Sequence, residues 1–481
     1  MTPPSPPLVP PVADPPLAAR LHSRRDPQAE ADRYVEALGA EIQGADFFIL
    51  IEPGAGYLIE SLRKRHPGGK PLILRADPLL NDFNKPGVPA WHSGSGKSLQ
   101  AFLESEIPEG SIARVVQWRP SLAVYGEACL ALLRESAAFL KRAKAGELTA
   151  AAFGPRWTRN FFRNLSRLNV FARIERMNAP VVIAGAGPSL EAALNEIRRS
   201  RDGIFLIAAS SALAALAAGG IAPDLAICTD GGGWALMHMR AFGLEPPPAK
   251  ALACALCAAL PSQCARTPAL ALSDGSLWQS IALKAAGVPS AFVPQRGTVT
   301  ASALELALSL SSGPIFFAGA DFAIADVKSH ARPYGFDHLF FGSAFRLRPH
   351  YAQAFERSLA MREGGSHDIY AQWFKARIES LRGRVFALEA GNGIFERRAK
   401  IEGARSGLKI AGVERLALPG LPAQRAEMAA RAIEGALADR ELAPRLTAEL
   451  GPLLFAGERG ASARDVAGKI SNITRRYARR P

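Results

Sequence analysis

The chain has 481 residues, of which 48% are hydrophobic, and its formal net charge is +14 at pH 7. This length predicts two or three domains with real cores. The positive charge is spread along the chain rather than gathered in a Lys/Arg block, which indicates an anionic ligand and disfavours nucleic acid. Neither a secretory signal nor a membrane span is evident, so we predict a cytoplasmic protein.

The five cysteines are odd in number and irregular in spacing, which fits reduced thiols in the cytoplasm. Cys254 and Cys257 are separated by two residues, but they lie in the apolar run 251–258. No second pair follows at the spacing that metal ligation needs. We therefore predict buried strand cysteines and no metal centre.

The chain is expected to begin with a proline-rich, disordered or extended tail at 1–20. Strands then alternate with helices, which predicts a small N-terminal α/β domain at 21–155 with a parallel sheet covered on both faces. Its strands are expected at 47–51, 71–74 and 114–117, and its helices at 30–42 and 58–64.

The stretch 156–176 is basic and aromatic, with a helical pattern. Aromatic and arginine side chains in such a helix suit base stacking, which would make it a nucleic-acid surface. A helix that packs its aromatic face between two domains is the preferred interpretation.

The central domain, at 156–405, alternates apolar strands with helices and predicts a doubly wound, Rossmann-like sheet. In such sheets ligands bind beyond the carboxyl ends of the strands. Strands are expected at 181–184, 204–208, 225–229, 251–256, 269–272, 291–293 and 315–318, and helices at 190–199, 212–218, 276–286 and 301–310.

The first of these strands ends in the turn Gly185-Ala-Gly187-Pro188-Ser189, after which a helix begins. A helix start offers free N–H groups and partial positive charge, so it suits a phosphate. Glycine lets the backbone come close to that group, and proline and serine both fit a first helical turn. Taken alone the turn is weak evidence, because many strand–helix junctions carry glycines for packing.

Polar residues and glycines also follow four further strands, and together the five strand ends predict a nucleotide site. Asp230 would accept ribose hydroxyls or hold a cation, and His330 would act as general base on an acceptor hydroxyl. Each has a structural alternative: aspartates and serines cap helices, threonines form turns, and His330 would be a solvated loop histidine. Asp321 would orient or charge this region, and it is the alternative to His330 as acceptor of the hydroxyl proton. The remaining candidates are Ser210, Gly297 and Thr298, with Arg296, Lys328, Arg332 and Tyr334 expected to neutralise a leaving phosphate.

The ordered motifs resemble the motility-associated factor (Maf) proteins of flagellin glycosylation, whose central domain is shared with the 6-hydroxymethylpterin diphosphokinase MptE-like family. The opening motif, Ile-Ala-Gly-x-Gly-Pro-Ser-Leu, is also similar to bacterial sialyltransferases, in which that loop meets CMP. The resemblance covers about residues 21–396 and rests on the segments 22–31, 182–191, 220–230, 297–303, 319–323, 328–331, 370–375 and 385–394.

The resemblance implies a transferase that moves a nonulosonic acid from its CMP carrier to Ser or Thr of flagellin. It implies that Gly185, Gly187, Pro188 and Ser189 contact the nucleotide. Asp230, Thr298, Asp321 and His330 would line the pocket. The chain departs from the family at two positions: Ala320 stands where a polar residue is usual, and Arg296 where a glycine is frequent. These departures weaken the assignment of the substrate and leave the fold prediction intact.

The C-terminal region, at 406–481, is expected to be helical, with helices at 423–440 and 461–480. It suits a contact with an acceptor protein or a homo-oligomer, or simple packing. Two alternatives to the CMP-nonulosonate transferase stay open: an ATP- and Mg²⁺-dependent diphosphokinase of the pterin type, and a non-catalytic flagellin-binding assembly factor. A Mg²⁺ requirement of the transferase itself is likewise left open.

Overall fold

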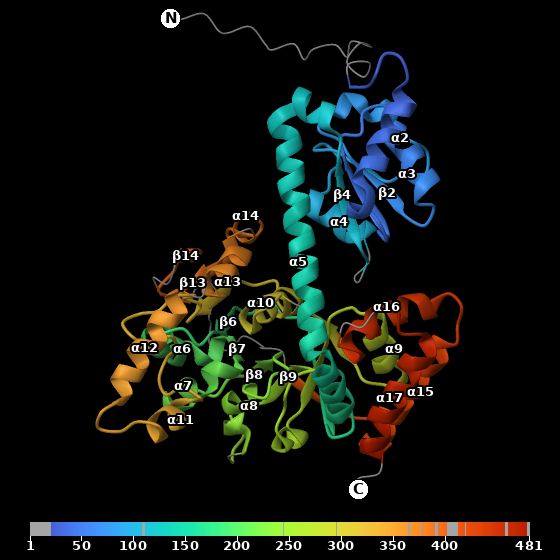
Figure 1. Cartoon of the computed structure of the whole chain (residues 1–481). Coiled ribbons are helices and arrows are strands. Elements are labelled where there is room, and N and C mark those ends of the chain that lie inside the picture. The colour runs from blue at the N-terminus through green and yellow to red at the C-terminus, as the bar shows by residue number, and fades with distance from the viewer. Residues whose placement is uncertain are drawn as a thin grey trace, which may run out of the picture. The chain divides into compact units, whose positions relative to one another are not determined.

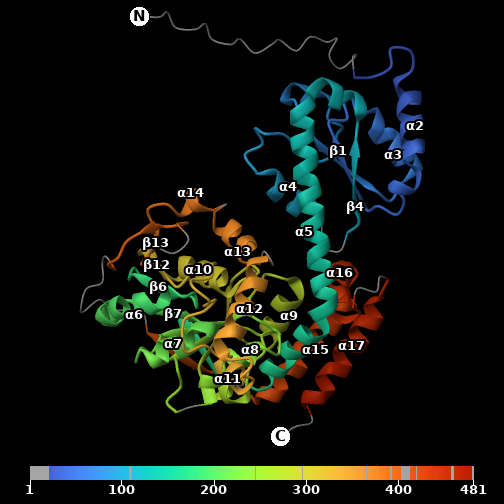
Figure 2. The same cartoon turned by 60° about the vertical axis from the view of Figure 1, so that its left-hand side comes forward.

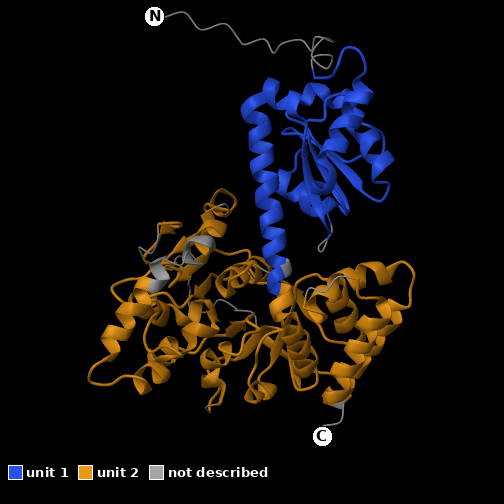
Figure 3. Cartoon of the chain, in the orientation of Figure 1, with its two compact units in different colours: residues 1–149 blue, residues 150–481 orange. Residues whose placement is uncertain are grey.

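The computed structural model divides the chain into two compact units, residues 1–149 and 150–481, which are described separately below (Figure 3). The proline-rich segment 1–20 lies outside the described residues. The structure describes residues 21–107, 111–243, 245–294, 296–363, 366–375, 377–389, 393–401, 412–418, 420–456 and 460–478.

The smaller unit contains a four-stranded sheet in the order β3-β2-β1-β4, with every pairing parallel. Alternate residues of β1 face different cores: Ile49 packs with α4, whereas Leu50 packs with α2 and α3. The prediction of a parallel sheet covered on both faces is therefore confirmed for this unit. The elements are β1 Phe47–Ile51, β2 Lys70–Leu74, β3 Ala90–Trp91, β4 Ala113–Gln117, α2 Pro27–Leu38, α3 Tyr57–Arg65 and α4 Leu99–Glu106.

Helix α5, Arg119–Leu165, runs from the smaller unit into the larger one, with Gly126 as a non-helical residue inside it. The domain boundary predicted at 155/156 falls within this helix. The prediction of one helix over 156–176 is wrong in its second half, because Val170–Ile174 forms strand β5. In β5 the buried Phe171 and Ala172 pack on opposite faces of the sheet, which is the period of a strand rather than of a helix.

The larger unit is built on one sheet in the order β14-β13-β12-β6-β7-β8-β9-β10-β5-β15, with β11 paired to β10. All pairings are parallel except that between β15 and β5. The strands are β6 Val181–Ala184, β7 Phe205–Ala209, β8 Leu225–Cys228, β9 Ala251–Ala255, β10 Ala269–Ser273, β11 Ser290–Phe292, β12 Ile315–Ala318, β13 Val385–Ala387, β14 Glu396–Arg397 and β15 Val413–Ala417.

Helices cover both faces of this sheet, as the near-continuous apolar strands require. In β6, Val182 and Ala184 belong to the core beneath α6, α7 and α9, whereas Val181 and Ile183 belong to the core beneath α10 and α13. Figure 2 shows α7 and α10 on opposite sides of β6 and β7. These helices are α6 Leu190–Arg199, α7 Leu213–Ala218, α9 Leu277–Ala285, α10 Val299–Leu310 and α13 Ser366–Lys375.

The C-terminal region joins the same core as the sheet. Helices α15 (Pro422–Leu437), α16 (Leu442–Leu454) and α17 (Ala463–Ala478) share one apolar cluster with α9. The helical prediction is confirmed for α15 and α17, whereas α16 and strand β15 were not predicted. None of the helices in the described ranges is long and apolar enough to cross a membrane.

Candidate functional site

The order of the strands indicates where a ligand would bind, which is at the carboxyl ends of the neighbouring strands β6 and β12. The chain leaves β6 through α6 and returns as β7 on one side, while β12 pairs with β6 on the other side. Parallel sheets open a crevice at the carboxyl ends of two strands whose connections diverge in this way. The predicted glycine turn after β6 and Asp321 after β12 both lie at that edge.

The glycine turn is packed tightly against the end of β12. The N–H of Gly185 donates to the carbonyl oxygen of Ala318 at 2.8 Å, and the N–H of Gly187 donates to that of Gly319 at 2.7 Å. A Cβ added to Gly185 would lie 2.5 Å from the oxygen of Gly319, and one added to Gly187 would lie 2.1 Å from Asp321 Oδ2. Glycine is therefore required here because the neighbouring backbone and carboxylate come so close.

Asp321 caps helix α6 from a distance of 132 residues in sequence, because its Oδ2 accepts the N–H of Ser189 at 2.9 Å. Ser189 occupies the N-cap position, but its own side chain makes no cap hydrogen bond. The Asp321 side chain is buried, and a carboxylate at a helix N-terminus is electrostatically favourable. Three amides of the predicted phosphate loop thus donate within the protein, and Gly319 and Asp321 occupy the space beside the two glycines, so the turn serves first as a packing contact.

The loop that carries His330 is anchored on the first turn of α6. The N–H of Ala331 donates to the carbonyl of Ala186 at 2.8 Å, and the N–H of Arg332 donates to Glu191 Oε1 at 2.9 Å. Lys328 Nζ lies 2.8 Å from Glu191 Oε2. Burial by itself would raise the pKa of Glu191, but these hydrogen bonds and charges lower it. These contacts hold the His330 loop against the glycine turn and the start of α6, although the two segments are far apart in sequence.

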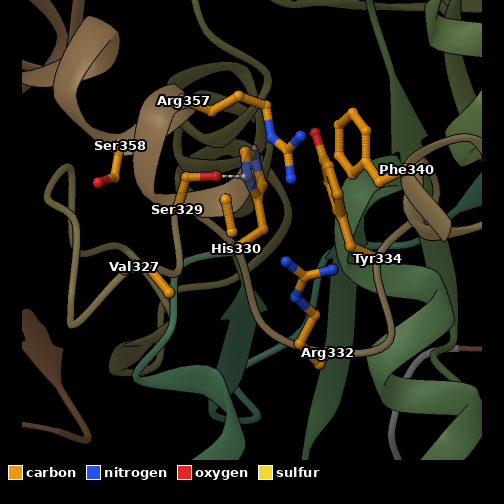
Figure 4. A pocket seen from close by; sticks show the side chains of 9 residues that line it. Val327, Ser329, His330, Arg332, Tyr334, Phe340, Arg357 and Ser358 are labelled. Atoms are coloured by element: carbon orange, nitrogen blue, oxygen red, sulfur yellow. Dashed lines mark hydrogen bonds between the residues drawn. The ribbon is translucent and has the colours of Figure 1, made fainter. Parts of the chain in front are cut away.

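His330 lies in a small polar pocket beside this anchor. Its ring stacks on Tyr334 with centroids 4.0 Å apart, and its Nδ1 lies 2.9 Å from Ser329 Oγ. Figure 4 shows Arg332, Arg357 and Tyr334 directed towards the His330 ring. The cavity measures about 20 Å³, which is room for roughly one water molecule. In this form the pocket admits a single small group, such as a hydroxyl.

Arg357, which the sequence did not suggest, gives this pocket much of its positive charge. It belongs to α12 (His350–Glu363), and its guanidinium lies over the Phe340 ring at 3.7 Å. Burial lowers the pKa of Arg357, and the like charges of Arg332 and Arg348 lower it further. Guanidinium groups brought together in this way attract an anion.

A second, larger pocket of about 210 Å³ opens at the ends of β12, β13 and β14. Ser189 and Asp321 line it, so the predicted turn borders this pocket. Arg397 and Glu389 supply charge of both signs, and neither was predicted as a site residue. Both follow the apolar strand β13, so strand-end position was the available signal. The other lining residues are Phe317, Gly319, Ala320, Ala387, Gly393 and Phe395.

The segment that follows β8 approaches the His330 loop where the ring of His238 lies beside that of Tyr334. Asp230 is exposed, and its Oδ1 accepts the N–H of Gly232 at 2.7 Å. His238, which was not predicted, lies 5.2 Å from Tyr334 between ring centroids. Burial lowers the pKa of His238, and the charge of Asp230 opposes this shift. Asp230, His238 and Tyr334 therefore form a chain of neighbours that ends at His330.

The remaining predicted residues lie at strand ends but with other partners. Ser210 is buried at the start of a 3₁₀ turn and bonds the thiol of Cys228, whose pKa burial raises to about 12. Thr298 is the N-cap residue of α10 without a side-chain cap bond, and Gly297 before it has φ +73°. Arg296 Nε lies 2.9 Å from Glu305 Oε1, so its charge is balanced on α10. Their roles towards a nucleotide stay predictions.

The described cysteines are free thiols; Cys254 is buried within β9 as predicted, whereas Cys257 follows the strand in a turn and is partly buried. Within the described ranges, no three His, Cys, Asp or Glu side chains gather as a metal-ligand set. The question of a Mg²⁺ requirement stays open. Phe161 and Phe162 are fully buried, so the aromatic stretch after Arg156 packs inside the unit rather than presenting these rings to bases.

Comparison with protein families identifies the central part of the chain. Residues 156–327 match the family model described as 6-hydroxymethylpterin diphosphokinase MptE-like. The matched segment contains the glycine turn, the end of β8, Thr298 and Asp321, so the predicted resemblance to this family is confirmed where those residues lie.

Similar proteins extend beyond the matched region. An uncharacterized protein of Treponema pallidum (strain Nichols) is 28% identical over 284 residues, which is 58% of this chain and 61% of that protein. A second uncharacterized protein of the same organism is 36% identical over 81 residues, which is 16% of this chain and 39% of that protein. The structure of MAf glycosyltransferase from Magnetospirillum magneticum AMB-1 aligns with a TM-score of 0.49 and 13% identity, over 96% of this chain and 80% of that one.

Proposed function

We propose that this protein is a glycosyltransferase that moves a nonulosonic, sialic-acid-like sugar from a CMP donor to Ser or Thr of flagellin. One observation carries the proposal. The His330 loop is fastened to the glycine turn by the bond of Ala331 and to the first turn of α6 by the bond of Arg332. A candidate base and a candidate nucleotide turn thus share one edge of a parallel sheet, where ligands bind.

The two pockets suggest how the substrates divide. The nucleoside would occupy the larger pocket, beside Ser189 and Asp321, because only this one approaches the size of a nucleotide. The phosphate or the acidic sugar would reach towards Arg357, whose guanidinium balances its charge, since Arg332 already forms an ion pair with Asp337. The acceptor hydroxyl would enter beside His330.

In this arrangement the acceptor oxygen attacks the anomeric carbon, and the bond from that carbon to the phosphate oxygen of CMP breaks. His330 takes the acceptor proton, which makes the oxygen a better nucleophile. In the tautomer in which Nδ1–H donates to Ser329 Oγ, the lone pair for this proton is on Nε2. Asp321 keeps the turn and α6 together, since its carboxylate holds the N–H of Ser189.

A pyrophosphate transfer from ATP to a pterin-like alcohol is the second candidate. The MptE-like match favours it, since that family model carries the diphosphokinase name. The two functions share a nucleotide pocket and a base but differ in the nucleotide and in Mg²⁺ dependence. Thermal-shift titrations with CMP, CTP, ATP and GTP, each with and without Mg²⁺, separate them. Stabilisation by CMP or CTP supports the transferase, whereas stabilisation by ATP with Mg²⁺ and not by CMP supports the diphosphokinase.

The role of His330 is tested by coexpression with flagellin and intact-mass analysis of that flagellin. We expect H330Q to abolish the added sugar mass while the protein stays folded. His338 lies eight residues later in the same segment and is exposed, so H338Q is the matched control and should leave modification intact. Equal modification by wild type and H330Q would remove His330 from the mechanism.

A further inference from the structure

The segment that follows the His330 loop exposes an unusual amount of apolar surface. Helix α11 (Asp337–Gly342) and α12 are joined by a short connection, and Figure 1 shows α12 at the outer edge of the larger unit. Tyr351, Phe355 and Leu359 are 63%, 49% and 43% exposed. Leu339, Phe341, Phe345 and Leu347 of α11 and the connection are also exposed. We call these seven side chains the α11–α12 surface.

Helix α12 carries an exposed apolar stripe in addition to its buried residues. Tyr351, Phe355 and Leu359 recur at intervals of four residues, so they form one stripe along the helix. The face directly beside this stripe holds Ala354 and Ser358, which are buried and line the His330 pocket. A helix packed on one side normally presents polar residues on the other, and contiguous apolar surface marks an interaction site.

The charge around this surface selects the partner. Between Leu339 and Leu359 the chain has three basic residues and one acidic residue; Arg346 and Arg348 lie exposed in the connection, and Arg348 pairs with Glu356. A second copy of the chain would bring the same positive charge against itself, which opposes self-association. An acidic partner would instead be attracted.

We infer that the α11–α12 surface docks the acceptor protein through an amphipathic helix that has an apolar stripe and acidic flanks. The inference rests on the proposed transfer to a protein, and it adds how that protein is recognised. Arg357 and Ser358 of α12 line the His330 pocket, while Phe355 and Leu359 of the same helix contact the partner. A helix docked there holds a neighbouring hydroxyl close to His330, because one rigid element forms both sites.

The docking is measured without any donor sugar, so it does not depend on the transfer reaction. The probe is a fluorescein-labelled helical peptide with leucines at i, i+3, i+4 and i+7 and glutamates beside them, compared with a lysine-for-glutamate version. We expect the acidic peptide alone to bind the full chain. Y351S/F355S should raise its Kd about tenfold or more, because aromatic anchors dominate such contacts. M428S removes a side chain on α15 that is equally exposed, at 51%, and should leave the Kd unchanged.

Transfer assays then distinguish the two proposals. Y351S/F355S should raise KM for the protein acceptor while hydrolysis of the donor stays at the wild-type rate. Peptide binding with no transfer by wild type would sink the proposed function and leave the docking surface intact. Transfer with an unchanged acceptor KM in Y351S/F355S would overturn the docking inference alone.

Other occupants give different results. If the surface binds membranes, wild type floats with phosphatidylglycerol vesicles, Y351S/F355S does not, and the acidic peptide fails to bind. If it binds a second copy, sedimentation shows a wild-type dimer that Y351S/F355S converts to monomers. Either result overturns the inference. A folded Y351S/F355S chain, verified by its circular dichroism and thermal transition, is expected because both side chains are exposed.

Discussion

The substitution G187A probes the contact that holds the glycine turn against β12. The new Cβ would lie 2.1 Å from Asp321 Oδ2 and 2.7 Å from the carbonyl oxygen of Gly319. Overpacking of this kind costs about 1–3 kcal/mol. Displacing the carboxylate also weakens its hydrogen bond to the Ser189 N–H, and hydrogen bonds to charged groups contribute about 1.5–3 kcal/mol. We therefore expect G187A to lower the free energy of unfolding by about 3 kcal/mol.

Urea unfolding of the full chain, followed by tryptophan fluorescence, is a suitable assay. Four of the six tryptophans lie in residues 150–481, so the signal reports mainly on the larger unit. The control is G233A, because a Cβ at Gly233 meets nothing within 4 Å and its φ lies outside the left-handed region. G233A should leave the free energy of unfolding nearly constant or raise it by about 0.5 kcal/mol, because alanine lowers the conformational entropy of the unfolded chain.

A double-mutant cycle identifies the cause of the loss. D321A removes the carboxylate that the new methyl group would strike, so G187A should cost about 1–2 kcal/mol less in the D321A background. Part of the loss in stability should remain in the D321A background, because the carbonyl oxygen of Gly319 still lies close to the new Cβ. Two outcomes would refute the reasoning: G187A as stable as G233A, or a cost that is the same with and without Asp321.

Three further predictions concern charged groups. Asp224 is buried and paired with Arg201, and hydrogen bonds lower its pKa although burial opposes this. D224N should cost about 2 kcal/mol at pH 7. The extra stability of the wild type is fully present above the pKa that Asp224 has in the unfolded chain. It is lost as the pH falls through the lower pKa of the folded protein, so the urea curves of the two proteins should converge below about pH 4; parallel curves would contradict this. Glu52 and Arg75 form a fully buried ion pair in the smaller unit. E52Q alone should cost about 3–5 kcal/mol in urea unfolding, and E52Q/R75M less than the sum of the single changes; additive losses would exclude this coupling. R357Q should raise KM for the nucleotide-sugar donor about tenfold if Arg357 faces the donor's anionic group, whereas R346Q, in the exposed connection, should not; equal KM values would place the donor elsewhere.

Local sequence was sufficient for the strand, the turn and the helix that surround Gly185 and Gly187. Four apolar residues before Gly185 predict a buried strand wherever they lie in the fold, and β6 has those bounds. The glycines and Pro188 predict a tight turn into a helix, because glycine is frequent in tight turns and proline suits the first helical turn. The parallel arrangement followed from the alternation of strands and helices, since crossover connections need a helix between paired strands.

The functional partners of those residues depended on the tertiary structure. Asp321 was a candidate pocket residue, yet its carboxylate caps α6 from 132 residues away. The Arg332 N–H reaches Glu191 across 141 residues. No spacing in the sequence encodes such contacts, because they exist only once β6 and β12 pair side by side. Arg357 likewise joined the site only when α12 packed beside the His330 loop.

The local pattern therefore predicts the strand, the turn and the helix start, whereas the need for glycine at position 187 comes from its contact with Gly319 and Asp321. The partners of a charge or an imidazole are decided by strand order, which brings distant loops to one edge of the sheet. The sequence by itself determined that a glycine turn precedes a helix at 185–190. Only the fold decided that Asp321, rather than Ser189, caps that helix, and that the His330 loop lies against it.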